Sequence, residues 1–280
     1  MDAGLEQPAH AARSVEWFDS MLNRTIKKVD EQFSKYRVSD ALMLIYRLFW
    51  DEFSSWYLES IKPDFEKPID QETYRRTHGF IDKLLHLLHP FMPFITEEIW
   101  QLISEREDGE SLMISPMPRA EKYDRGLLKR YETVKEVVTA VRNIRKENNI
   151  PPREQLELMF RNAEGGGHHT ELEPVMKKLA NLSSVVQTVK DPDQAASFIV
   201  NNVEYFVPVG SKVDTSEEIE RLEAELNYTR GFLVSVQKKL ENERFVKHAP
   251  PAVVEKEKQK LEDASAKIRV LTAQLEKLRP

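Results

Sequence analysis

Apolar residues recur three and four positions apart through the first half of the chain, the spacing of one buried face on a helix. The clearest run is Val15, Phe18, Leu22, Ile26, Val29 and Phe33. Prolines and turn residues separate such runs. They predict helices over about 14–36, 39–62, 71–88, 94–103 and 123–149. We therefore expect an all-helical bundle in this part of the protein.

The second of these helices is rich in aromatic residues. Ser39 is a candidate N-cap, and Pro63 ends the helix. Its apolar face is too broad for a surface helix, so we expect burial on much of its circumference. Burial of a large side chain contributes roughly 1.5–3 kcal/mol without any ligand. We therefore assign four aromatic residues to the bundle core rather than to base stacking: Phe49, Phe53, Trp56 and Tyr57.

The hydrophobic period changes after residue 150. Three segments have the composition of strands, namely "LELMFR" (156–161), "SSVVQTV" (183–189) and the hairpin "FIVNNVEYFVPV" (198–209). Asn201 and Asn202 can adopt the positive φ of a tight hairpin turn. A helix is expected over about 171–181. The segment 151–212 is thus predicted to form a small β-α-β-β unit.

Heptad spacing begins near Asp214. The two expected seams are Ile219, Leu222, Leu226, Thr229, Leu233, Val236 and Leu240, then Val254, Leu261, Ala264, Ile268, Leu271, Leu275 and Leu278. A proline-containing turn joins them, so we expect an antiparallel coiled-coil hairpin; pairing between two molecules is the alternative. The fold class is therefore mainly α, with a helical bundle, a small α/β connecting unit and a C-terminal hairpin.

Composition limits the possible functions. The net charge of −6 excludes a globally basic nucleic-acid binder, so an electrostatic site must be a local patch. The absence of cysteine excludes disulfides and thiol nucleophiles and fits a reducing compartment. No apolar run approaches the roughly 18 residues of a membrane span, and "MDAGLEQPAHAARS" lacks a signal core. We expect a cytoplasmic protein without membrane contact.

Candidate catalytic and metal-binding groups are few. His86 and His89 are three residues apart on a helix, but no further ligand completes a metal site, and we predict none. His168–His169 and the glycines at 165–167 are interpreted as loop. Glu97 and Glu98 are adjacent and do not face each other, so we expect them to favour the helix N-terminus. The alternative is that Glu97 or Glu98 accepts from a base amino group. We predict no catalytic residue.

Basic clusters are the best candidates for binding. On the helix 123–149, the cations Arg142, Arg145 and Lys146 fall on one side. Arg24, Lys27 and Lys28 form a similar edge on the first helix, and the aromatic residues Phe33 and Tyr36 at its end are candidates for stacking on bases. The hairpin tip carries Lys238, Lys239, Arg244, Lys247, Lys256, Lys258 and Lys260. A solvated face and a phosphate-contacting surface are both compatible with each cluster.

Four stretches resemble the C-terminal region of bacterial valyl-tRNA synthetases, a class I aminoacyl-tRNA synthetase family. They are "YRVSDALMLIYRLFWDEFSSWYLESIKP", "HPFMPFITEEIWQLI", "VRNIRKENNIPPREQLEL" and "ENERFVKHAPPAVVEKEKQKLEDASAKI". They occur in the family's order and, with the hairpin, cover nearly the whole chain. The family's His-Ile-Gly-His-like and Lys-Met-Ser-Lys-Ser-like motifs do not occur in the 280 residues.

The resemblance implies three parts: 14–150 would be an anticodon-binding domain, 151–212 a connection and 213–280 a tRNA-binding arm. We expect residues 1–13 to be a disordered or expression-derived lead. The resemblance further implies valine tRNA and the parent chain's catalytic domain as partners, no DNA binding, and no cofactor in this chain, because ATP and magnesium would bind in the catalytic domain. We expect Met1 to open an expressed fragment that is inactive in aminoacylation alone; a natural split is the alternative. The competing functional hypothesis is a helical adaptor that docks proteins through its hairpin.

Overall fold

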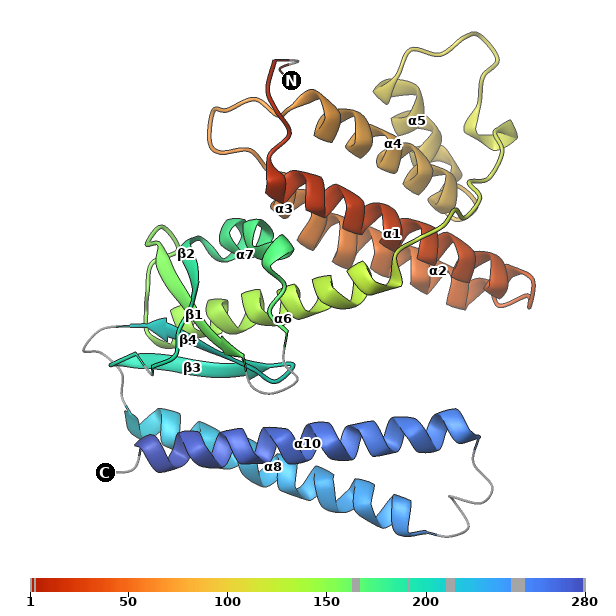
Figure 1. The fold of residues 1–280 in the computed structure, drawn as a ribbon. Coiled ribbons are helices and arrows are strands. Elements are labelled where there is room, and N and C mark those ends of the chain that lie inside the picture. The colour runs from red at the N-terminus through yellow and green to blue at the C-terminus, as the bar shows by residue number, and fades with distance from the viewer. Residues whose placement is uncertain are drawn as a thin grey trace. The chain divides into compact units, whose positions relative to one another are not determined.

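The computed structural model describes residues 2, 4–162, 167–190, 192–209, 215–242 and 250–278. The chain forms two compact units (Figure 1). The first, here called the bundle unit, comprises residues 1–139 and 169–182. The second, here called the sheet–arm unit, comprises residues 140–168 and 183–280. No described helix is both long and apolar enough to cross a membrane.

The bundle unit is helical, as the apolar spacing predicts. Its elements are α1 (Ala9–Phe33), α2 (Val38–Arg47), the π-helix η1 (Leu48–Tyr57), α3 (Leu58–Ile61), α4 (Gln71–Leu88), α5 (Pro93–Ile103), the 3₁₀ turn η2 (Leu112–Ile114), the first part of α6 (Arg125–Glu147), η3 (Thr170–Leu172) and α7 (Glu173–Ala180). Helix α7, expected within the connection, groups with the bundle unit and contacts α1.

Helix α1 begins earlier than its apolar spacing indicates. It starts at Ala9, after an extended Pro8, and Ala11 is buried. Residues 9–13 are therefore helical, and the expectation of a disordered lead is wrong for them. The segment is rich in alanine, which favours helix but adds little to a hydrophobic pattern.

The core of the bundle unit is aromatic. The Phe18 ring lies 5.2 Å from that of Phe53, 4.8 Å from that of Tyr57 and 5.1 Å from that of Phe80. All four side chains are buried. These contacts join α1, η1 and α4, so the aromatic-rich segment serves mainly as scaffold.

The aromatic-rich segment is not the continuous α-helix that we expected. Its middle, η1, is a π-helix, and the Ser54 hydroxyl donates to the carbonyl of Phe49, five residues earlier, at 3.0 Å. A π-helix turns less per residue than an α-helix, so the helical-wheel prediction of burial fails along it. Phe53 and Tyr57 are buried as predicted, whereas Phe49 and Trp56 are only half-buried.

The sheet–arm unit contains the end of α6 and a four-stranded sheet. Its strands are β1 (Leu156–Asn162), β2 (Leu182–Gln187), β3 (Ala195–Val200) and β4 (Val203–Pro208), in the order β2-β1-β4-β3. Strand β4 pairs antiparallel with both β1 and β3. Asn201 and Asn202 have φ of 48° and 61°, so the predicted tight turn between β3 and β4 is confirmed.

The arm consists of α8 (Thr215–Glu241) and α10 (Pro251–Leu278), which run antiparallel side by side (Figure 1). The predicted seam is buried at Leu222, Leu226, Thr229, Val236, Ala264, Leu271 and Leu275. The side chains of Ile219 and Leu278 lie outside the described residues. The two heptad runs therefore pack on each other within one chain, which confirms the hairpin.

Candidate nucleic-acid interface

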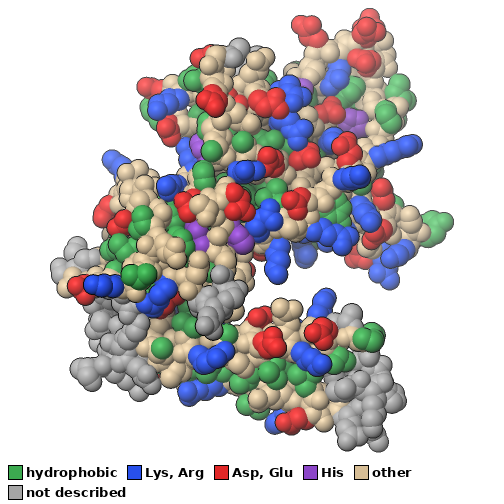
Figure 2. Space-filling view, viewed as in Figure 1, with side chains coloured by type: hydrophobic (Ala, Val, Ile, Leu, Met, Phe, Trp, Pro, Cys, Tyr) green, Lys and Arg blue, Asp and Glu red, His purple; other side chains and the backbone are tan. Residues whose placement is uncertain are grey.

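The distal end of the arm carries an excess of positive charge. Residues 238–242 and 250–260 contain five lysines and three glutamates. Lys238, Lys239, Lys256, Lys258 and Lys260 are all exposed, as a phosphate-contacting surface requires. The predicted Arg244 and Lys247 lie outside the described residues. Figure 2 shows acidic, basic and hydrophobic side chains interspersed along the visible face of the arm.

One buried carboxylate organises part of this surface. Glu257 lies 2.7 Å from the ammonium of Lys260 and 3.8 Å from that of Lys239, so it links the two helices. The hydrogen bond from Lys260 lowers the pKa of Glu257 below its usual value. Lys239 and Lys260 are therefore held in place by an internal partner.

A groove lies on the middle of the arm between α8 and α10. It has a volume of about 400 Å³, and its lining includes Tyr228, Phe232, Lys260 and Lys267. Tyr228 is 78% exposed and Phe232 39% exposed. Exposed aromatic rings beside lysines are typical of surfaces that stack unpaired bases. Sequence analysis missed both rings, although each lies off the heptad seam of α8 and has no role in it.

A second aromatic group lies at one end of the bundle unit. Phe33, the last residue of α1, stacks on Phe91 with ring centroids 6.3 Å apart. Three residues beyond each partner are Tyr36, 92% exposed, and Phe94, 90% exposed. Tyr36 has φ of 57°, a left-handed conformation that is rare for a side chain of this size. The prediction named Phe33 and Tyr36 but missed Phe91 and Phe94.

Basic residues accompany this aromatic end. Lys27, Lys28, Lys35 and Arg37 are exposed on α1 and the turn after it. Arg24 is half-buried, and its Nη2 lies 2.7 Å from the sulfur of Met21. Of the predicted α1 cations, Lys27 and Lys28 are thus the better placed for phosphate contact.

The structure gives Glu97 a different role from the predicted contact with tRNA. Its carboxylate accepts from the hydroxyl of Ser111 at 3.0 Å, the amide of Leu112 at 2.9 Å and the side chain of Gln101 at 2.9 Å. The bond from Gln101, with the others, lowers the pKa of Glu97. The carboxylate holds the η2 turn against α5, which leaves little capacity to accept from an RNA base.

Arg145 also has a different role from the predicted contact with tRNA. It is 8% exposed, and its Nη1 donates to the carbonyls of Glu154 at 2.8 Å and Pro151 at 3.3 Å. Burial lowers the pKa of its guanidinium. The side chain therefore fastens the turn between α6 and β1 instead of lining an exposed stripe, which is reduced to Arg142 and Lys146.

The histidines have local partners. Nδ1 of His86 lies 2.8 Å from the Asp82 carbonyl, and Nδ1 of His89 lies 2.8 Å from the Thr96 hydroxyl. His168 stacks on Phe160 at 3.9 Å. Within the described ranges, no three His, Cys, Asp or Glu residues are grouped to hold a metal ion. Gly165 and Gly166 lie outside these ranges.

Comparison with known sequences assigns both parts of the chain. Residues 15–160 match the family described as the anticodon-binding domain of tRNA ligase, and residues 214–279 match the valyl tRNA synthetase tRNA binding arm. The chain is 49% identical over 269 residues to the valine–tRNA ligase of Parabacteroides distasonis, a match that covers 96% of this chain and 30% of that protein. The valine–tRNA ligase of Porphyromonas gingivalis is 44% identical over 272 residues, covering 97% of this chain and 31% of that protein.

The chain thus spans about 30% of the length of these curated relatives. The first matched segment covers most of the bundle unit and extends through the end of α6 into β1, and the second covers the arm. They include the aromatic and basic surfaces described above. The chain therefore belongs to the tRNA ligase anticodon-binding domain family, and corresponds to the C-terminal region of bacterial valyl-tRNA synthetases, including their tRNA-binding arm.

Proposed function

We propose that this chain binds valine tRNA at two places. The aromatic end of the bundle unit takes the anticodon loop, and the arm contacts the outer corner of the folded tRNA. The observation that carries the proposal is the match of residues 214–279 to a tRNA-binding arm, on a hairpin whose distal lysines are exposed.

The chemistry of the two surfaces supports different roles. Unpaired anticodon bases can stack on exposed rings such as Tyr36 and Phe94, and recognition of single-stranded loops is the usual way that RNA sequence is recognised. The lysines of the arm offer point charges to phosphates, which position a nucleic acid without specifying its sequence. We infer that discrimination between anticodons resides in the bundle unit.

Aminoacylation is proposed to lie outside residues 1–280. The relatives are about three times as long as this chain, so most of their length lies outside it. On this proposal the chain works with the catalytic domain of a longer valine–tRNA ligase in the cytoplasm. That domain, and not this chain, would hold ATP and magnesium.

A gel-shift titration of the chain against valine tRNA and an unrelated tRNA, at several salt concentrations, tests the proposal. An RNA binder with several phosphate contacts loses affinity steeply with salt, with a log–log slope that grows with the number of contacts. We expect such a slope and a preference for valine tRNA. A chain that binds neither tRNA at low salt would instead favour the protein-docking adaptor.

A further inference from the structure

The root of the arm is fastened to the sheet of its own unit by a buried side chain. Gln274 on α10 is 5% exposed and lies beside the seam residue Leu275. Its amide nitrogen donates to the Ser197 hydroxyl of β3 at 3.2 Å and to the Glu204 carboxylate of β4 at 2.9 Å. One amide thus connects the arm to two neighbouring strands.

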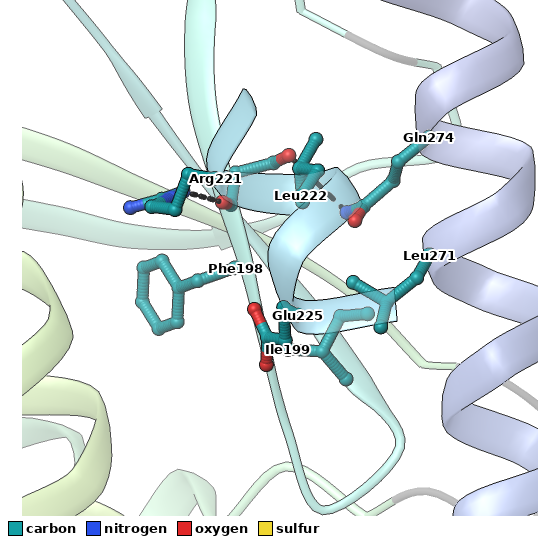
Figure 3. A pocket seen from close by; sticks show the side chains of 8 residues that line it. Phe198, Ile199, Arg221, Leu222, Glu225, Leu271 and Gln274 are labelled. Atoms are coloured by element: carbon teal, nitrogen blue, oxygen red, sulfur yellow. Dashed lines mark hydrogen bonds between the residues drawn. The ribbon is translucent and has the colours of Figure 1, made fainter. Parts of the chain in front are cut away.

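The two residues that Gln274 contacts form further polar contacts with β1 and α8. Glu204 is itself 8% exposed and forms an ion pair with Arg161, its register partner on β1. Arg221 on α8 donates to the carbonyl of Ser197 at 3.4 Å, a bond drawn in Figure 3. It also lies 3.3 Å from the carboxylate of Glu147 on α6. Both helices of the arm therefore contact the same strand residue.

Apolar packing surrounds these bonds. Leu222, Leu226, Leu271 and Leu275 form a buried cluster against which Ile199 of β3 packs. A cavity of about 130 Å³ remains beside the cluster, lined in part by Phe198 and Gln274. Apolar contact is non-directional and tolerates sliding, and the cavity leaves room for it. The hydrogen bonds of a buried amide are directional, and each costs about 1–3 kcal/mol to leave unmade.

We propose that Gln274 is a positioning residue that fixes the angle of the arm on the sheet and so sets where the distal lysines meet the tRNA. This inference rests on the proposed function. The 27 residues of α8 span about 40 Å, so a rotation of about 10° at the root moves the tip by roughly 7 Å. That displacement is close to the Debye length of about 8 Å over which exposed charges interact at physiological salt.

The test uses the full chain, which has no cysteine to interfere with labelling. Spin labels at Gln187→Cys on β2 and Gln259→Cys on α10, both exposed, report the distance between sheet and arm by pulsed electron paramagnetic resonance. Gln274→Glu replaces the donating amide with a carboxylate that faces Glu204. The double variant Gln274→Glu/Glu204→Gln exchanges donor and acceptor, and Asn227→Asp adds the same charge at an exposed site on α8.

We expect a narrow distance distribution in the unmodified background and in Asn227→Asp, broadening in Gln274→Glu, and recovery in the double variant. If the docked fraction falls to about one tenth, tRNA affinity falls about tenfold. Circular dichroism of each variant verifies that the helices remain folded.

A distance distribution that Gln274→Glu leaves unchanged would overturn the inference. So would a broadened distribution with unaltered tRNA affinity, because the angle would then have no bearing on binding. If the unmodified chain binds no tRNA, the proposed function fails and the positioning role fails with it, while the distances still show whether Gln274 fastens the arm.

Discussion

The rings of Phe33 and Phe91 lie 6.3 Å apart with planes inclined by 22°, which joins the end of α1 to the turn before α5. Each partner is three residues from a ring that the protein leaves almost fully exposed, Tyr36 or Phe94. A half-buried stacked pair with two exposed rings close by in the chain is an arrangement suited to binding an RNA loop.

Tyr36→Ala and Phe94→Ala are expected to weaken binding of an isolated valine anticodon stem-loop by about 1–3 kcal/mol each, the value of one stacked base. Phe65→Ala is the matched control, because Phe65 is 90% exposed in the same unit but lies in the loop before α4. Fluorescence anisotropy provides the affinities. If all three variants bound the stem-loop with the same affinity, the aromatic end would not be the anticodon site.

Reversal of charge at the arm tip should weaken binding of whole tRNA without altering anticodon discrimination. Lys238→Glu and Lys256→Glu are the cleaner choices, because Lys239 and Lys260 also pair with Glu257. Lys129→Glu, exposed on α6, is the control. Affinity for valine tRNA and for a tRNA with a changed anticodon should fall by the same factor. Unequal losses would show that the arm discriminates anticodons.

The α6 cations should separate by role. Lys146→Ala is expected to reduce the log–log salt slope of tRNA binding by about 0.7–0.9, the share of one phosphate contact, with little change in thermal stability. Arg145→Ala should lower the melting temperature, because the carbonyls of Pro151 and Glu154 lose their donor, and leave the slope unchanged. A reduced slope in Arg145→Ala without loss of stability would restore it to the interface.

Stability should follow burial within the π-helix. Phe53→Ala, at a fully packed site, is expected to cost about 3–5 kcal/mol in the free energy of unfolding. Trp56→Ala should cost less, roughly 1–2 kcal/mol, since the indole is only half-buried. Urea denaturation measures both. The reverse order would mean that Trp56 belongs to the core after all.

Local periodicity was sufficient to predict much of the fold. The heptad seam from Leu222 to Leu275 follows from the spacing of apolar residues along each helix. The hairpin turn follows from two consecutive residues, Asn201 and Asn202, that adopt positive φ. Both patterns are visible in the sequence. The half-burial of Trp56 is not, because Trp56 lies in a π-helix, whose rarity gives it no recognisable local pattern.

The candidate site was predicted less completely for a related reason. On the helical wheel Arg142, Arg145 and Lys146 lie on the same side. Arg145 points inward because the carbonyls of the turn at 151–154 accept hydrogen bonds from it, and the wheel does not show where that turn lies. Tyr228 and Phe232, in contrast, were accessible to sequence analysis, as large rings at positions off the seam.

Hydroxyl-radical footprinting of valine tRNA bound to the full chain tests the central claim most directly. The account predicts two separate protected regions, one in the anticodon loop and one at the outer corner. In the Lys238→Glu/Lys256→Glu variant, protection should be lost at the corner and kept in the loop. Protection of a single region, or loss of both regions together in that variant, would contradict it.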